Sequence, residues 1–154
     1  MKRLFLMRHG HALTPGEAGV GTDALRPLSD KGCRDVPRMA AELARREGAP
    51  ALILHSPLRR AEQTAALAAA ALKGAAPQVF TPLDNTLPPD QVLEHLHERA
   101  GRTESVLAIG HQPQLGELAA LLGSGVLDIR PGGVVALEIG AKPRLLWSLN
   151  PEEL

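Results

Sequence analysis

The chain has 154 residues, a length that fits a single domain over residues 1–154 and allows about two-thirds of the unfolded surface to be buried. Lysine plus arginine and aspartate plus glutamate number 17 each, and the one cysteine is Cys33, so overall charge favours neither nucleic acid nor an anionic membrane, and an internal disulfide is excluded. No apolar stretch is long enough to span a membrane, and Arg8 interrupts the first apolar run too early for a signal peptide, so we expect a cytoplasmic protein.

The first apolar run, Leu4–Met7, predicts a buried strand that leads directly into Arg8-His9-Gly10-His11. Ligands bind at the carboxyl ends of strands in open α/β sheets. Imidazole is partly unprotonated at neutral pH, and guanidinium matches the geometry of phosphate. Arg8 and His9 in this position therefore indicate a phosphoryl-binding site with a histidine nucleophile.

The next segment, Thr14–Arg26, has no hydrophobic period and predicts a loop over the end of the first strand, where binding groups are often found. Ser29 is then the expected N-cap of a helix that ends at Gly48 and Pro50. The apolar stripe of this helix consists of Val36, Met39, Ala40 and Leu43.

A second buried strand is predicted over Ala51–Leu54, followed at once by His55-Ser56-Pro57. Ser56 as N-cap and Pro57 at the first helical position predict a helix that continues to about Leu72. Helical geometry places Arg60 on the face that carries Thr64 and Leu67 and reaches the core. Arg59 points about 100° away, toward solvent and Glu62. We therefore expect Arg60, rather than Arg59, in the site.

Gln78–Phe80 predicts a short third strand, and Pro82–Pro89 predicts a loop interrupted by prolines. A helix is expected from Asp90, and its apolar stripe consists of Val92, Leu93, Leu96 and Ala100. His95 and His97 lie two residues apart on this helix and face different sides of it, so we expect both at the surface.

Ser105–Ile109 is the clearest apolar run and predicts a fourth strand that ends at Gly110-His111. Pro113 opens the next helix, expected over Leu115–Leu122 and closed by Gly123. The backbone N–H groups at the start of that helix are expected to face the same space as His111 and to form an anion site.

Two terminal strands, Val134–Ile139 and Arg144–Leu149, are expected to form a hairpin at one end of the sheet. Strands that alternate with helices predict an α/β fold with three α/β/α layers and a mostly parallel central sheet. The strand ends lie on one edge of such a sheet, so their polar residues can converge on a space the size of a phosphate. These residues are Arg8, His9, Ser56, Arg60 and His111.

The order of motifs along the whole chain resembles the histidine phosphatase superfamily, which includes phosphoglycerate mutases and many phosphatases. The motifs are Arg8-His9-Gly10, Leu28-Ser29-x-x-Gly32, Ser56-Pro57-x-x-Arg60-Ala61-x-x-Thr64 and Gly110-His111. The short chain and the sequences around His9 and Arg60 are most similar to the SixA phosphohistidine phosphatases. The resemblance implies a phosphoglycerate mutase-like fold without a large cap insertion.

The resemblance also implies a mechanism. His9 would attack phosphorus and become transiently phosphorylated, and water would then release phosphate. The catalytic set would be His9, Arg8, Arg60 and His111, and the substrate-binding set would be Arg8, Arg60, His111, Ser56 and His11. Because two guanidinium groups and an imidazolium supply the positive charge, neither a metal nor a cofactor is expected. A backbone carbonyl is expected to fix the tautomer of His9.

Superfamily members that act on phosphate esters usually supply a general acid, since an alkoxide leaves poorly without a proton. The candidates in this chain are Asp84, Asp90 and Glu17, and none lies in a clear family motif. A phosphohistidine can leave as neutral imidazole and has less need of such an acid. This favours a phosphohistidine-bearing protein as substrate, docked over Thr14–Arg26 and Pro82–Pro89.

Three alternatives remain open from the sequence. The same machinery could act on a small phosphate ester. His9 and His11 could instead be ligands of a metal-dependent hydrolase, although no carboxylate cluster in the sequence completes such a site. The chain could also be a non-catalytic phosphate-binding module, although the nucleophile, both arginines and the second histidine are all present.

Overall fold

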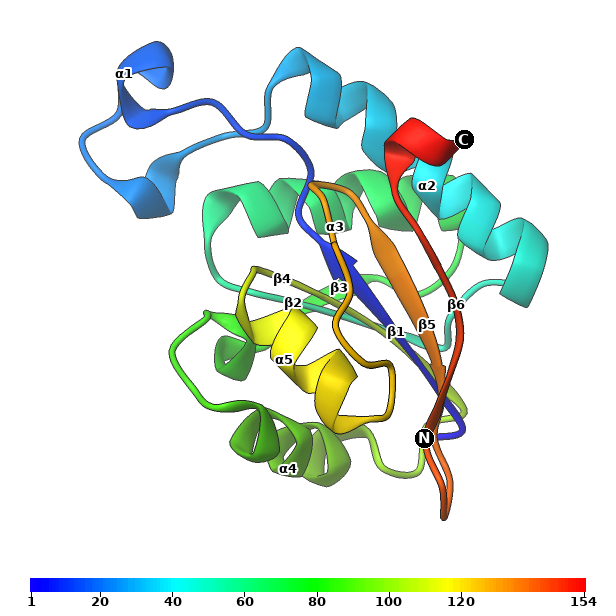
Figure 1. The fold of residues 1–154 in the computed structure, drawn as a ribbon. Coiled ribbons are helices and arrows are strands. Elements are labelled where there is room, and N and C mark those ends of the chain that lie inside the picture. The colour runs from blue at the N-terminus through cyan, green and yellow to red at the C-terminus, as the bar shows by residue number, and fades with distance from the viewer.

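The computed structural model describes residues 1–154 and contains a six-stranded sheet with helices on both faces (Figure 1). The strands are β1 (Arg3–Arg8), β2 (Leu52–His55), β3 (Pro77–Val79), β4 (Ser105–Gly110), β5 (Val134–Glu138) and β6 (Arg144–Leu149). Their order in the sheet is β3-β2-β4-β1-β5-β6. The first four are parallel, whereas β5 runs antiparallel to both β1 and β6. The predicted mostly parallel sheet and its terminal hairpin are therefore confirmed.

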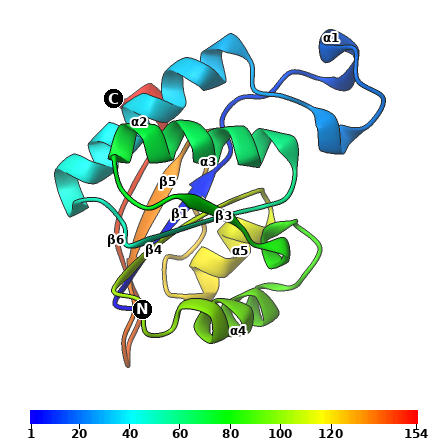
Figure 2. The ribbon, with the colours of Figure 1, turned by 180° about the vertical axis from the view of Figure 1, so that it is seen from behind.

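Except for the short helix over Pro15–Ala18, which lies in the segment that extends beyond β1, the helices form the two outer layers, as Figure 1 and the reverse view in Figure 2 both show. The helices are α1 (Pro15–Ala18), α2 (Asp30–Glu47), α3 (Arg59–Leu72), α4 (Pro89–Ala100) and α5 (Gln114–Leu121). The pair α2 and α3 covers one face of the sheet, and the pair α4 and α5 covers the other. This is the predicted three-layer α/β/α architecture, and no large insertion interrupts it. None of the helices combines the length and the apolar character needed to cross a bilayer.

The central strands are apolar on both sides because both faces are covered. Successive side chains of a strand point to opposite faces. Leu4 and Leu6 of β1 accordingly pack into the core beneath α4 and α5, whereas Phe5 and Met7 pack into the core beneath α2 and α3. Arg8 follows Met7 at the end of the strand, and its backbone is fixed on both sides by pairing with Gly110 and by donating its N–H to the Gly133 carbonyl at 3.0 Å.

The segment after β1 passes close against the start of α2. Ser29 caps this helix as predicted, with its hydroxyl accepting from the Gly32 N–H at 3.2 Å. A side chain on Gly32 would bring its Cβ within 2.3 Å of the backbone oxygen of His11. A Cβ on Gly10 would come within 2.8 Å of Val36 and 3.3 Å of the Cα of Gly32. Gly10 and Gly32 therefore allow the segment after β1 and the first turn of α2 to approach each other closely.

Two local predictions were inexact. The predicted loop over Thr14–Arg26 contains the short helix α1, whose Thr14–Glu17 capping box was not recognised, and a 3-10 turn over Asp23–Leu25. The prediction that Ser56 caps α3 was wrong, since α3 begins at Arg59 with Leu58 as N-cap. The hydroxyl of Ser56 instead accepts from the Leu58 N–H at 3.2 Å and bonds a second partner in the site.

Replacing Gly32 by alanine is expected to destabilise the protein by about 1–3 kcal/mol, because the new methyl group meets a backbone oxygen that has no free rotation. Gly16→Ala in α1 is the matched control, because nothing lies within 4 Å of a Cβ at that position. Urea unfolding of both variants and the wild type measures the difference. Equal stability of Gly32→Ala and wild type would contradict the close approach described above.

Candidate active site

The polar residues predicted at the strand ends lie together at the carboxyl edge of the sheet. Arg8 is the last residue of β1, and His9 follows it with its N–H donating to the Gly110 carbonyl at 3.0 Å. The N–H of Ser56, just after β2, donates to the Ile109 carbonyl of β4 at 3.0 Å. The ends of β1, β4 and β2 are thus tied to one another, and the predicted convergence is observed.

His9 is buried and its ring orientation is fixed. Its Nδ1 donates to the carbonyl oxygen of Gly10 at 2.7 Å. A carbonyl oxygen can only accept, so the ring proton is on Nδ1 and the lone pair is on Nε2. The Nε2 atom accepts from the Nε–H of Arg60 at 3.3 Å. The expectation that a backbone carbonyl sets the tautomer is confirmed, and the unprotonated ring nitrogen faces a guanidinium.

Thr64 holds the backbone beside His9. Its hydroxyl accepts from the Gly10 N–H at 3.0 Å and donates to the Arg60 carbonyl at 2.7 Å. Thr64 is fully buried one helical turn after Arg60 on α3. The sequence placed Thr64 on this face, but its link to Gly10 depends on a contact across 54 positions of the chain.

Arg60 is buried and each of its three guanidinium nitrogens donates a hydrogen bond, whereas Arg59 is exposed, as predicted. In addition to the bond to His9, the Nη1 of Arg60 donates to the backbone oxygen of Asp23 at 2.9 Å. Its Nη2 donates to the Asp23 carboxylate at 3.1 Å. Arg59 forms a surface ion pair with Glu62 at 3.5 Å. Asp23 is therefore a site residue that the sequence analysis missed.

Arg8 is held from the opposite side of the site. Its Nη1 donates to the Ile129 carbonyl at 3.0 Å, while its Nε is buried and has no partner. Burial lowers the pKa of Arg8, and the nearby carboxylate of Asp128 opposes this change. A buried donor without a partner is costly unless a ligand satisfies it. Arg8 therefore has hydrogen-bonding capacity to offer to an anion.

His111 lies beside His9, with ring centroids 5.1 Å apart and ring planes tilted by 53°. Its Nε2 forms a hydrogen bond with the hydroxyl of Ser56 at 2.7 Å, and its Nδ1 is buried without a partner. The second hydrogen bond of the Ser56 hydroxyl is thus made to His111. Ser56 acts on this edge of the site as an orienting group for the imidazole.

Burial and neighbouring positive charge keep both imidazoles neutral. Burial is the main cause that lowers the pKa of His9 to about 3, with further lowering by His111, Arg60 and Arg8. Burial and Arg60 lower the pKa of His111 to about 4, while Asp23 and Asp84 act in the opposite direction. An anion placed among these groups would oppose the effect of the arginines and raise the pKa of His111.

The remaining candidates lie at the periphery. His11 is exposed and its Nδ1 bonds the hydroxyl of Ser29 at 2.6 Å. Asp84 is half-buried and accepts a hydrogen bond from the N–H of Thr86. The negative charge of its carboxylate acts to raise the pKa of His111.

Two further candidates for a general acid are exposed. Glu17 is bonded into the cap of α1, and its bonds to Thr14 lower its pKa. Asp90 lies in the first turn of α4, and no hydrogen bond joins it to the residues around His9. Glu17 is therefore held in the ionised form, which is unsuited to donating a proton.

The predicted anion site at the start of α5 was wrong, because its N–H groups are already used. The Gln114 N–H donates to the side chain of Asn85 at 3.1 Å, and the Leu115 N–H donates to the His111 carbonyl at 3.0 Å. The Gly116 N–H donates to the side chain of Gln112 at 2.7 Å. These two side chains and the His111 carbonyl satisfy the helix end in the way that an anion would have done.

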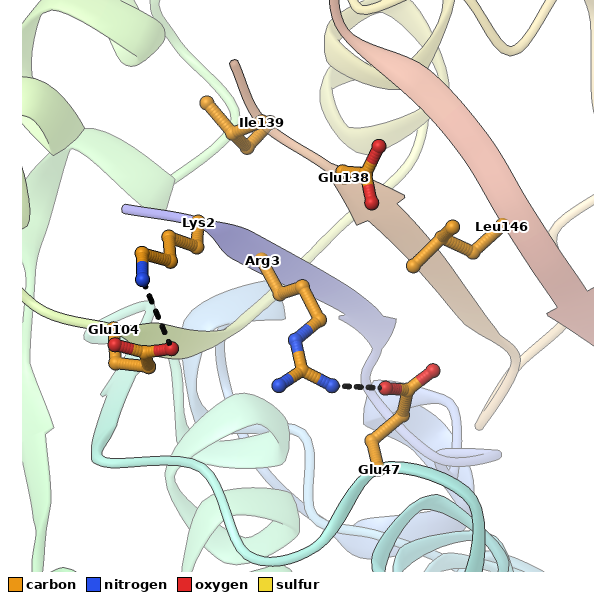
Figure 3. Close-up of a pocket in the computed structure, with 7 residues that line it drawn as sticks. All are labelled: Lys2, Arg3, Glu47, Glu104, Glu138, Ile139 and Leu146. Atoms are coloured by element: carbon orange, nitrogen blue, oxygen red, sulfur yellow. Dashed lines mark hydrogen bonds and ion pairs between the residues drawn. The ribbon is translucent and has the colours of Figure 1, made fainter.

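The largest cleft lies at the opposite end of the sheet from His9, beside the amino end of β1 (Figure 3). It has a volume of about 470 Å³ and is lined by Lys2, Arg3, Glu47, Glu104, Glu138, Ile139 and Leu146. Its charges are largely paired within it, as in the bond from Arg3 to Glu47 at 2.6 Å. A smaller cavity of about 220 Å³, lined in part by Asp84, lies closer to the site. No group of three or more His, Cys, Asp or Glu side chains is arranged to hold a metal ion.

Comparison with known proteins agrees with this geometry. A model of the histidine phosphatase superfamily (branch 1) matches residues 4–85. An uncharacterised protein of Picosynechococcus sp. is 35% identical over 147 residues, which cover 90% of this chain and 86% of that protein. The protein histidine phosphatase SixA complexed with tungstate has a similar structure, with a TM-score of 0.87, 26% identity and 97% of each chain covered. The mycobacterial glucosyl-3-phosphoglycerate phosphatase in complex with VO3 shares the fold, with a TM-score of 0.71, 19% identity, and 96% of this chain and 98% of that chain covered.

The depressed pKa values of His9 and His111 predict that the protein loses stability as the pH falls below about 6.5. Below that pH both histidines of the unfolded chain take up protons. In the folded chain His111 becomes protonated only near its pKa of about 4, and His9 only near its pKa of about 3. The stability is thus fully present above pH 6.5 and declines by roughly 1 kcal/mol per pH unit for each histidine.

Urea unfolding between about pH 7.5 and pH 5, above the range in which most carboxylates titrate, measures this decline. His111→Gln should show a shallower decline than the wild type. His97→Gln, at an exposed position of α4, should keep the wild-type slope. Stability of the wild type that does not change over this range would contradict the neutral, buried state of the two imidazoles.

Proposed function

The chain belongs to the histidine phosphatase superfamily and is a phosphatase with a histidine nucleophile, and we propose that it hydrolyses phosphohistidine on a protein, as a SixA-type phosphatase. The observation that carries the covalent mechanism is the fixed tautomer of His9, whereas the choice of substrate rests on the leaving group. The Nδ1 of His9 carries the ring proton and donates to the Gly10 carbonyl, so the lone pair that would attack phosphorus is on Nε2. His9 is therefore the nucleophile in this proposal.

The reaction proceeds in two displacements at phosphorus. In the first, the lone pair of His9 Nε2 forms a bond to phosphorus while the bond to the substrate nitrogen breaks and its electron pair leaves with the imidazole. In the second, water attacks phospho-His9, which releases inorganic phosphate and restores Nε2. Arg8, Arg60 and His111 surround this position and stabilise the charge on the phosphoryl oxygens.

The choice of phosphohistidine over an ester rests on the leaving group. A phosphohistidine protonated on its other nitrogen leaves as neutral imidazole, whereas an alkoxide needs a proton from the enzyme. The carboxylate nearest to His9 in the hydrogen-bond network is that of Asp23, which is paired with Arg26 and Arg60 and whose pKa is lowered by them. Glu17 is likewise held ionised. Neither group is suited to act as a general acid.

The surroundings of His9 suit a substrate presented on a protein surface. No cavity of the protein is lined by His9, Arg60 or His111, and no large insertion covers these residues. The segment Thr14–Arg26 reaches Arg60 through Asp23, and the segment Pro82–Pro89 reaches the start of α5 through Asn85. We infer that a phosphohistidine-bearing protein docks over these two segments.

A second candidate substrate is a small phosphate ester, and Asp84 is the observation that favours it. Asp84 is half-buried, borders a cavity of about 220 Å³ and is close enough to His111 for its charge to raise the pKa of that imidazole. A carboxyl group in this place could protonate an ester oxygen. The mycobacterial relative with the same fold acts on a sugar phosphoglycerate, as its name states.

We expect rapid phosphate release from a histidine-phosphorylated protein and little release from a panel of small phosphate esters, with excess chelator present. His9→Ala should reduce release by at least about 1,000-fold, because the covalent step is lost. His97→Ala, at an exposed position of α4, serves as the control and should retain wild-type rates.

Preference for the esters would overturn the substrate assignment while keeping the mechanism. In that case Asp84→Asn should lower the ester rate. Undiminished release by His9→Ala, or loss of activity in chelator, would overturn the proposed mechanism.

A further inference from the structure

We propose that Asp23 is a positioning residue that holds the guanidinium of Arg60 with one edge turned toward the phosphoryl group on His9. This inference rests on the proposed function, since it assigns a part in the same reaction to a residue that lies outside the superfamily motifs. Asp23 belongs to the 3-10 turn Asp23–Leu25, in the segment that extends over the end of β1.

The hydrogen bonds of Arg60 divide its guanidinium into two edges. A guanidinium has five N–H donors in a rigid plane. Asp23 accepts one from each terminal nitrogen, through its backbone oxygen at 2.9 Å and its carboxylate at 3.1 Å. The Nε–H points instead at the attacking nitrogen of His9, at 3.3 Å. Asp23 thus binds the end of the guanidinium that carries the two terminal nitrogens, and the side edge with the Nε–H faces His9.

The side edge is suited to a phosphoryl oxygen, because its Nε–H loses its present acceptor once the lone pair of His9 Nε2 bonds phosphorus. The Nε–H and one remaining N–H of Nη2 lie parallel on that edge, which is the forked geometry that binds phosphate with two hydrogen bonds. A phosphoryl group bonded to His9 Nε2 would occupy the space that this edge borders. Rotation of the guanidinium about its long side chain would remove the fork, so a fixed plane is needed for both bonds to form.

Asp23 is itself held in place, which makes it an effective anchor. Its second carboxylate oxygen accepts from Arg26 Nη1 at 3.0 Å, and the Nε of Arg26 donates to the Leu13 carbonyl at 2.8 Å. The side chain of Asp23 is 62% exposed, while that of Arg60 is 9% exposed. The bonds from both arginines lower the pKa of Asp23, so it remains an acceptor at neutral pH. Its role is to orient Arg60 rather than to transfer a proton.

Asp23→Ala should lower kcat by about 10- to 100-fold with little change in KM, because a misplaced guanidinium loses its fit to the transition state more than to the bound substrate. Asp23→Asn keeps a side-chain oxygen that can accept from Nη2 and should recover most of kcat. Glu62→Gln is the matched control, because it removes the carboxylate from an arginine pair on the solvent side of the same helix.

A kcat of Asp23→Ala equal to or above that of the wild type would overturn the proposal. Tighter inhibition by inorganic phosphate together with a higher kcat/KM in this variant would also overturn it, since Asp23 would then be a competitor of phosphate at Arg60. Failure of Asp23→Asn to exceed Asp23→Ala would likewise contradict a positioning role through the side-chain oxygen.

An experiment that does not depend on turnover separates this proposal from the proposed function. In NMR spectra of the full chain, the Nε–H of Arg60 should exchange slowly in the wild type and in Asp23→Asn, and rapidly in Asp23→Ala. Equal exchange in all three proteins would overturn the proposal. If the wild type releases phosphate from neither substrate class, the proposed function fails, whereas the NMR comparison still decides the role of Asp23.

Discussion

The hydrogen bond from His9 Nδ1 to the Gly10 carbonyl is the interaction on which the site depends, because it decides which ring nitrogen keeps its lone pair. The bond can do this only if the Gly10 peptide is itself fixed. Thr64 holds the Gly10 N–H from α3, and the Cα of Gly10 lies so close to α2 that a side chain would meet Val36 at 2.8 Å. The tautomer of His9 is thus set by the packing of one backbone segment between two helices.

The charges of the site follow from the same packing. Burial removes water from both imidazoles and lowers their pKa values, so the positive charge at neutral pH comes from Arg8 and Arg60 alone. Asp23 offsets part of the charge of Arg60, and an incoming phosphoryl group would supply the opposite charge that favours protonation of His111. The donors are fixed before the substrate arrives, so little reorganisation is needed when charge develops in the transition state.

The sequence predicted those features that depend on neighbours along the chain. The apolar runs located the strands, and the 100° step of a helix separated the buried Arg60 from the exposed Arg59. The incorrect predictions involve contacts between distant segments. Ser56 has the sequence pattern of a helix cap, but its hydroxyl bonds His111, 55 positions away. The N–H of Gln114 donates to the side chain of Asn85, which the sequence pattern does not reveal. Asp23 lies in a segment without a hydrophobic period, so nothing local distinguished it.

The two helix layers support different parts of the reaction. His9 and the segment after it are held from the side of α2 and α3, which contribute Gly32, Thr64 and Arg60. The groups that could interact with a leaving group lie on the other side of the sheet. There Asp84 precedes α4, and the side chain of Asn85 accepts from the first N–H of α5. Because the two sets of contacts share few residues, changes near α5 can alter the supply of a proton donor without disturbing the tautomer of His9. The choice between phosphohistidine and an ester is therefore separable from the covalent step that both reactions share.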